Sequence, residues 1–118
     1  MIINIKLYMI EGRDDKYLEM IKRVIKETMG ELGLSNSIIR FISVKISRDY
    51  IDVIRGMLLG GEGPAEFMPI INELREYEIF DLPALIINGR KIIEGRDLSP
   101  PTEVRRLISN RVKELLHD

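Results

Sequence analysis

The sequence predicts one α/β domain built on a small mixed sheet, and three observations predict it. Residues 2–46 show the pattern strand, helix, strand; an Asn-Gly pair joins two short apolar runs; and residues 99–117 repeat apolar side chains at helical spacing. The chain has 118 residues, and a chain of this size buries one core without cross-links. We therefore expect a single domain that spans residues 1–118.

The first third of the chain forms a βαβ pattern. Apolar and polar residues alternate along residues 2–10, which predicts a strand. From about residue 15, apolar residues recur at helical spacing until Gly30 and Gly33, the residue type that commonly ends helices. Residues 38–46 alternate again, as a second strand. Two strands joined by a helix in this way run parallel, with a right-handed crossover.

The middle of the chain predicts two helices separated by a turn. Ser47-Arg48-Asp49 is a capping sequence for a short helix that ends near Leu59, and residues 60–64 then turn the chain. The following helix contains Pro69, which lacks an amide donor and clashes with the preceding helical turn. We therefore expect the regular helix to begin at Pro69 or to kink there.

The last third contains the strongest local signal. Residues 84–87 and 90–93 flank Asn88-Gly89, the pair that best fits a type I′ hairpin turn. Ser99, followed by two prolines, marks the start of a final helix. The residues expected in the core come from all these elements: Ile5, Leu7, Ile21, Ile25, Val44, Leu85, Ile87, Ile108 and Val112.

Composition excludes several classes of function. The 18 basic and 19 acidic residues nearly cancel, whereas a nucleic-acid binder gains its affinity largely from neutralising phosphates. No apolar run approaches the roughly 20 residues that a membrane helix needs, and the start of the chain lacks the features of an export signal. We expect a cytoplasmic protein without nucleic-acid or membrane partners. Its 20 isoleucines, absence of glutamine and dense charges resemble the composition of heat-adapted proteins.

Two residue counts exclude most nucleophilic and metal chemistry. The chain has no cysteine, which removes disulfides, thiol nucleophiles, iron–sulfur clusters and thiolate zinc sites. Its single histidine, His117, lies beside the C-terminus, so neither a Ser-His-Asp triad nor a histidine-rich metal site is expected. We expect no cofactor and no catalytic residue.

The order of elements and the run from Leu82 to Ile92 resemble the glutaredoxins of the thioredoxin-like superfamily. This resemblance implies a four-stranded mixed sheet in the spatial order 2-1-3-4, with helices on both faces and a helical insertion around residues 48–67. Asp97-Leu98 matches an Asp-Leu pair of that family. Ile93-Glu94 replaces the diglycine that precedes the pair, which argues against a glutathione site.

The family's Cys-x-x-Cys belongs between the first strand and the first helix, where residues 11–18 contain no sulfur. The resemblance therefore implies a redox-inactive member. In the family, the proline that matches Pro83 is cis and leaves the backbone of the preceding residue, here Leu82, free to pair with an extended peptide. The residues expected to bind a peptide or ligand are accordingly Glu11, Gly12, Arg13, Asp14, Asp15, Leu82, Pro83, Gly95 and Asp97.

A second resemblance points to the same kind of function. Lys6-Leu7-Tyr8, Gly12 and Asp97-Leu98-Ser99 resemble the KaiB family, whose thioredoxin-like members bind other proteins without redox chemistry. We therefore expect a non-enzymatic module that binds a protein or peptide.

One alternative is a glutathione-transferase-like enzyme or thiol-ligand carrier, whose cosubstrate supplies the sulfur and in which Tyr8 and Asp97 act. Another is a structural subunit whose groove is unused.

Three acidic residues, Glu11, Asp14 and Asp15, lie where the family has its cysteines. Paired carboxylates can carry acid–base chemistry or hold a divalent ion. Acidic residues at a helix start also cap the helix and offset its dipole, and this second interpretation is favoured.

Residues 48–68 carry more apolar side chains than a short surface connection needs: Ile51, Ile54, Met57, Leu58, Leu59, Phe67 and Met68. These side chains either cover one edge of the core or form an interface between two copies, and we expect a homodimer through this segment. The first helix alternates basic residues with glutamates, a pattern typical of a solvated helix face, so we assign it no function.

Overall fold

The computed structural model describes residues 1–95 and 100–117 and contains one four-stranded mixed sheet. Its spatial order is β2-β1-β3-β4, as predicted. The central strand β1 pairs in parallel with β2 and antiparallel with β3, which forms a hairpin with β4. The strand bounds are Ile3–Ile10 for β1, Ile39–Ile46 for β2, Ala84–Ile87 for β3 and Arg90–Glu94 for β4.

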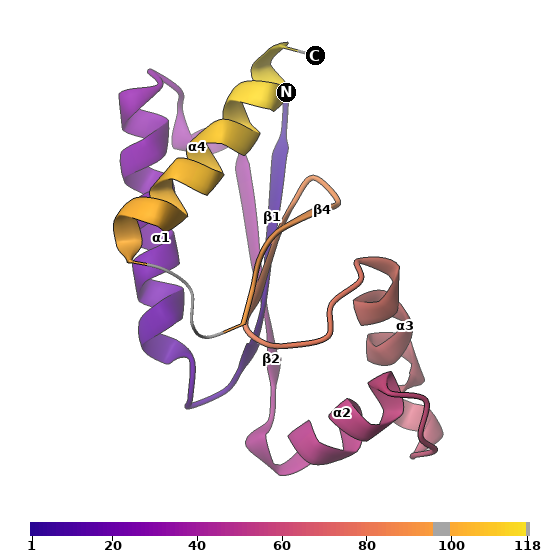
Figure 1. The fold of residues 1–118 in the computed structure, drawn as a ribbon. Coiled ribbons are helices and arrows are strands. Elements are labelled where there is room, and N and C mark those ends of the chain that lie inside the picture. The colour runs from indigo at the N-terminus through magenta and orange to yellow at the C-terminus, as the bar shows by residue number, and fades with distance from the viewer. Residues whose placement is uncertain (96–99, 118) are drawn as a thin grey trace.

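Helices cover both faces of this sheet, which confirms the predicted α/β layers (Figure 1). On one face lie α1 (Asp15–Glu31) and α4 (Pro101–His117), packed on the odd-numbered side chains of β1. On the other face lie α2 (Ile51–Leu58) and α3 (Met68–Glu76), packed on Tyr8 and the even-numbered residues near it. Because side chains alternate along a strand, β1 divides the interior into two apolar clusters.

The segment between β2 and α3 is helical, as predicted. Short 3₁₀ turns at Arg48–Tyr50 and Ala65–Phe67 flank α2. The Ser47 side chain accepts a hydrogen bond from the Asp49 amide at 3.3 Å, in its predicted capping role. Pro69 occupies the second position of α3, where its missing N–H is not needed. The expected helix start beside Pro69 is therefore confirmed.

The Asn-Gly turn joins β3 to β4 in the predicted manner. Asn88 and Gly89 have φ angles of 45° and 76°, the positive values that a type I′ turn requires. The turn is tied to β1, because the Asn4 amide donates to the Asn88 side-chain oxygen at 2.7 Å and the Asn88 amide donates to the Asn4 carbonyl at 2.8 Å. The Asn88-Gly89 turn thus fixes the β3–β4 hairpin against the central strand β1.

The expected core residues are buried, with one exception. Val44 is only half-buried, because β2 is an edge strand and its side chains have neighbours on fewer sides than those of β1. Among the described residues, no helix is long and apolar enough to cross a membrane.

Candidate functional site

The structure brings together five of the predicted site residues: Arg13, Asp14, Leu82, Pro83 and Gly95. The Leu82–Pro83 bond is cis, as expected, and the Gly95 amide donates to the Pro83 carbonyl at 2.8 Å. Arg13 and Asp14 contribute from the turn between β1 and α1, with the Arg13 guanidinium 2.8 Å from the Leu82 carbonyl. Asp97, also predicted for this site, lies outside the described residues.

An ion pair between Arg13 and Asp14 forms the base of this site. The Asp14 side chain is 3 % exposed, and its two oxygens accept from Arg13 Nε at 2.9 Å and Arg13 Nη2 at 3.0 Å. Asp14 Oδ2 also accepts from the Ile10 amide at 2.9 Å. The Asp14 carboxylate therefore links the Ile10 amide, at the end of β1, to the Arg13 guanidinium, which in turn binds the Leu82 carbonyl.

The backbone of Leu82 is engaged within the chain, so the expectation that it is free for a peptide is wrong. Its carbonyl accepts from Arg13 Nη2 at 2.8 Å, and its amide donates to the Asp81 side chain at 2.9 Å. A backbone carbonyl buried away from water needs a hydrogen-bond donor, and the Arg13 side chain supplies the donor for Leu82. A peptide that paired with Leu82 would have to compete with Asp81 for its amide and share or displace the Arg13 bond to its carbonyl.

The favoured interpretation of the acidic residues needs a correction. Asp14 stands at the N-cap position of α1 but makes no capping bond, because its carboxylate accepts from Ile10 and Arg13 instead. Asp15 accepts from the Gly12 amide at 3.2 Å, and Glu11 is exposed. Within the described ranges, no three His, Asp or Glu residues gather as metal ligands would.

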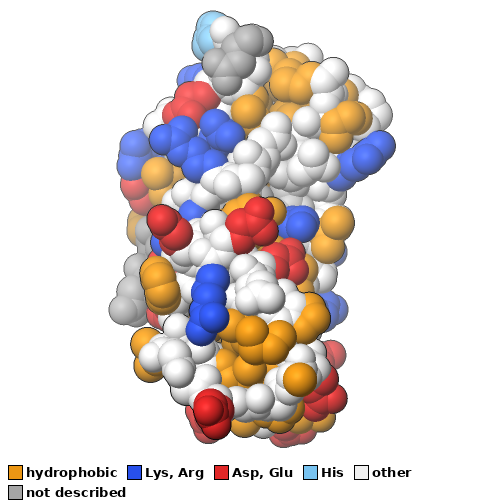
Figure 2. All heavy atoms as spheres, turned by 90° about the vertical axis from the view of Figure 1, so that its right-hand side faces the viewer, with side chains coloured by type: hydrophobic (Ala, Val, Ile, Leu, Met, Phe, Trp, Pro, Cys, Tyr) orange, Lys and Arg blue, Asp and Glu red, His pale blue; other side chains and the backbone are white. Residues whose placement is uncertain are grey.

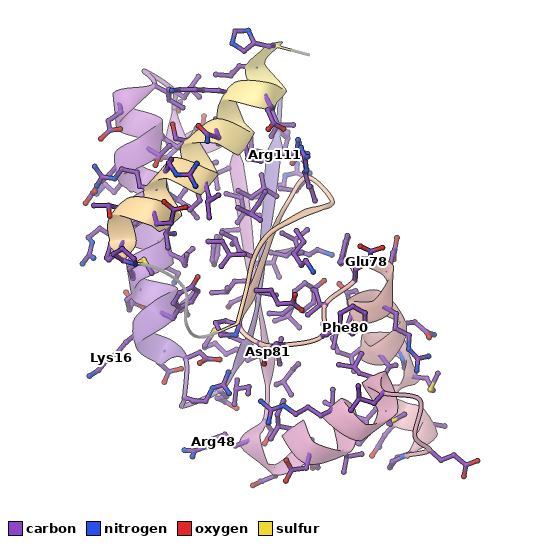
Figure 3. The ribbon with its side chains drawn as sticks, viewed as in Figure 1. Lys16, Arg48, Glu78, Phe80, Asp81 and Arg111 are labelled. Atoms are coloured by element: carbon purple, nitrogen blue, oxygen red, sulfur yellow. The ribbon has the colours of Figure 1, made fainter. Side chains whose placement is uncertain are left out.

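A hollow of about 340 Å³ opens beside these groups. We call it the Pro83 pocket; its lining residues are Arg13, Asp14, Lys16, Tyr17, Met20 and Pro83. Figure 3 shows Lys16 extending outward from the first turn of α1, at the same end of the sheet as Asp81. Sequence reasoning missed Lys16, Tyr17 and Met20, although Met20 follows Lys16 by four residues and Tyr17 by three, a spacing that places them on one side of the first helix.

The Tyr17 hydroxyl is the most distinctive polar group of the Pro83 pocket. Its oxygen is buried and has no hydrogen-bond partner in the part of the chain that the structure describes. Burial, and then the negative charge of Asp14, raises the pKa of Tyr17 to about 12. The hydroxyl is therefore neutral at ordinary pH and keeps its proton.

Tyr8, the residue suspected of catalysis in the enzyme alternative, does not join the Pro83 pocket. Its side chain is fully buried in the cluster under α2 and α3, and its hydroxyl donates to Glu73. Burial, and then this hydrogen bond, raises the pKa of Tyr8 far above its usual range. A raised pKa is the opposite of what a hydroxyl needs to act as an ionised group.

The predicted site residues thus fall into two sets. Arg13, Asp14 and Pro83 line the pocket, whereas Glu11, in the turn before α1, and Asp15, the first residue of α1, are exposed. No protein-family model matches the chain, and the comparisons with curated proteins and with solved structures give no match either.

Proposed function

We propose that this chain is a redox-inactive binding module of the thioredoxin-like kind, which binds a protein segment or small ligand in the Pro83 pocket. The supporting observation is the hollow of about 340 Å³ beside Pro83 and the start of α1, lined in part by Arg13 and Tyr17. Thiol–disulfide exchange needs a thiolate, and the chain has no cysteine.

The lining of the pocket indicates what it would recognise. Lys16 adds a positive charge at the rim, and Met20 offers an adaptable apolar wall. A ligand oxygen that reached the buried Tyr17 hydroxyl, as the pocket wall adjusts, would accept one hydrogen bond from it. Because Arg13 already occupies the Leu82 carbonyl, side-chain contacts carry this binding better than strand addition does. The favoured ligand therefore has an acceptor oxygen, such as a carboxylate or carbonyl, beside an apolar body.

Replacing Tyr17 with phenylalanine tests this proposal. A peptide selected from a random library for binding to the wild-type chain should bind Tyr17→Phe roughly tenfold more weakly in calorimetric titration, because a hydrogen bond is lost. Unfolding in urea should show equal or higher stability, since a buried hydroxyl without a partner costs about 1–3 kcal/mol.

The matched control is Tyr50→Phe, at an exposed tyrosine in the 3₁₀ turn before α2. It should leave the affinity for the selected peptide unchanged. Failure to select any binder, or equal binding by both variants, would contradict the proposal.

We also propose that two copies associate through residues 48–68. Leu59 is 85 % exposed, and Tyr50, Val53 and Met68 are exposed large apolar residues of the same segment. Figure 2 shows hydrophobic side chains gathered on the face formed by α2, α3 and their connection, in the lower half of the view. Sizeable apolar patches on soluble proteins commonly mark interaction sites.

Leu59→Lys should convert this dimer to a monomer in sedimentation equilibrium at high micromolar concentration. The substitution places a charge in the proposed interface and leaves folding intact, because Leu59 contributes little buried area in one copy. The control is Leu116→Lys, at a partly exposed leucine of α4, which should leave the dimer intact. A wild-type chain that sediments as a monomer would rule out the dimer.

A further inference from the structure

The free edge of β2 is a second feature that the proposed function does not use. β2 pairs with β1 over its whole length, Ile39–Ile46, without a register shift. On its other side, no strand among the described residues pairs with it (Figure 1). β2 has eight residues without proline or bulge, and its backbone groups that point away from β1 meet no other strand of the described chain. Such an edge is the template to which an extended segment adds as a further strand.

A groove runs beside this edge, between β2 and α1. It encloses about 290 Å³ and is lined by Lys22, Ile25, Lys26, Asn36, Ile39 and Phe41. Ile25 is buried, and Ile39 and Phe41 are half-buried, so the floor is apolar. Lys22 and Lys26 are exposed on the helix side. A strand added to β2 would place every second side chain over this groove.

The charged residues that line the groove, and those of β2, are all positive. Lys22 and Lys26 border the groove, and β2 itself carries Arg40 and Lys45, both exposed. None of these four forms an ion pair within residues 1–95 and 100–117, and no acidic side chain lines the groove. Lys45 lies on the same face of β2 as Phe41, because residues of equal parity share a face.

From these observations we infer that β2 and the α1 groove bind an extended acidic segment of another protein by strand addition. An apolar side chain of the segment enters the groove over Ile39 and Phe41. Carboxylates two residues before and after it, on the same face, meet the lysines of α1 and Lys45. A second copy of this chain fits poorly, because its β2 would bring another Arg40 and Lys45, and no acidic side chain, to this basic edge.

The probe is a capped peptide, Thr-Glu-Thr-Val-Thr-Glu-Thr, with a twin in which lysine replaces both glutamates. We expect the acidic peptide to shift the backbone amide NMR signals of β2 and of the part of α1 that borders the groove, and the lysine twin to shift none. Lys22→Glu combined with Lys26→Glu should weaken binding about tenfold, since two attractive charge pairs become repulsive.

The matched control is Arg90→Glu combined with Lys113→Glu, which makes the same change in net charge at the opposite edge of the sheet. Arg90 is the first residue of β4, and Lys113 lies on α4. This control should change the affinity less than twofold. Tyr17→Phe should have no effect, which separates this site from the Pro83 pocket. Equal binding of the two peptides, signal shifts confined to other elements, or concentration-dependent shifts of β2 without peptide would overturn the inference.

Discussion

Asp14→Ala is expected to lower the free energy of unfolding by about 3–5 kcal/mol, the usual cost of removing one partner of a buried ion pair. Asp14 is 3 % exposed and accepts two hydrogen bonds from Arg13 and one from the Ile10 amide. Its removal leaves a largely buried guanidinium without its counter-charge and a buried amide without an acceptor. Urea unfolding at pH 7 measures the loss.

The neighbouring carboxylate provides the control for this prediction. Asp15 is exposed, and its hydrogen bond is to the Gly12 amide. Asp15→Ala should therefore change stability by roughly 0.5–1 kcal/mol, the range for a helix-terminal charge and one exposed hydrogen bond. Equal losses for the two variants would show that Asp14 contributes only its charge at the helix start.

The Asp14 substitution should also affect the Pro83 pocket. Arg13 Nη2 bonds both Asp14 and the Leu82 carbonyl, so its position depends on the carboxylate. Without Asp14, the guanidinium loses one of its two anchors, and the pocket wall becomes less ordered. A peptide selected on the wild-type chain should consequently bind Asp14→Ala more weakly, even in conditions where the variant remains folded.

Much of the fold was predictable because its signals are local. The alternation of β1 and β2 and the Asn88-Gly89 turn each depend on residues a few positions apart. The handedness of a βαβ unit then determines that β1 and β2 run parallel. Val44 was placed wrongly in the core because periodicity shows which face a residue takes, and does not show how much of that face is covered.

The candidate site was less predictable because its contacts join distant residues. Arg13 and Leu82 are 69 positions apart, and nothing in either local sequence indicates that one side chain binds the other's carbonyl. The Asp14 carboxylate turns toward Ile10 rather than into α1, a choice that depends on tertiary packing. Lys22 and Lys26 likewise belong to a charge pattern of solvated helices, and only the fold places them beside the free edge of β2.

The second apolar cluster permits a further test, because α3 is held mainly through two fully buried residues, Ile71 and Leu74. Leu74→Ala is expected to lower the free energy of unfolding by about 2–5 kcal/mol, through lost burial and the cavity that remains. Leu74 packs in the cluster that contains Tyr8, on the opposite sheet face from α1 and α4. In this variant, α2 and α3 should therefore open before the rest of the fold.

Native-state hydrogen exchange distinguishes this local effect from a global one. In Leu74→Ala, the amides of α2 and α3 should exchange at least tenfold faster than in the wild-type chain, whereas those of α1 change less, because a small helical unit opens before the rest. Asn72→Ala is the control, at an exposed residue of the same helix. A uniform acceleration across all four helices would instead mean that the two clusters unfold as one unit, and that β1 couples them rather than separating them.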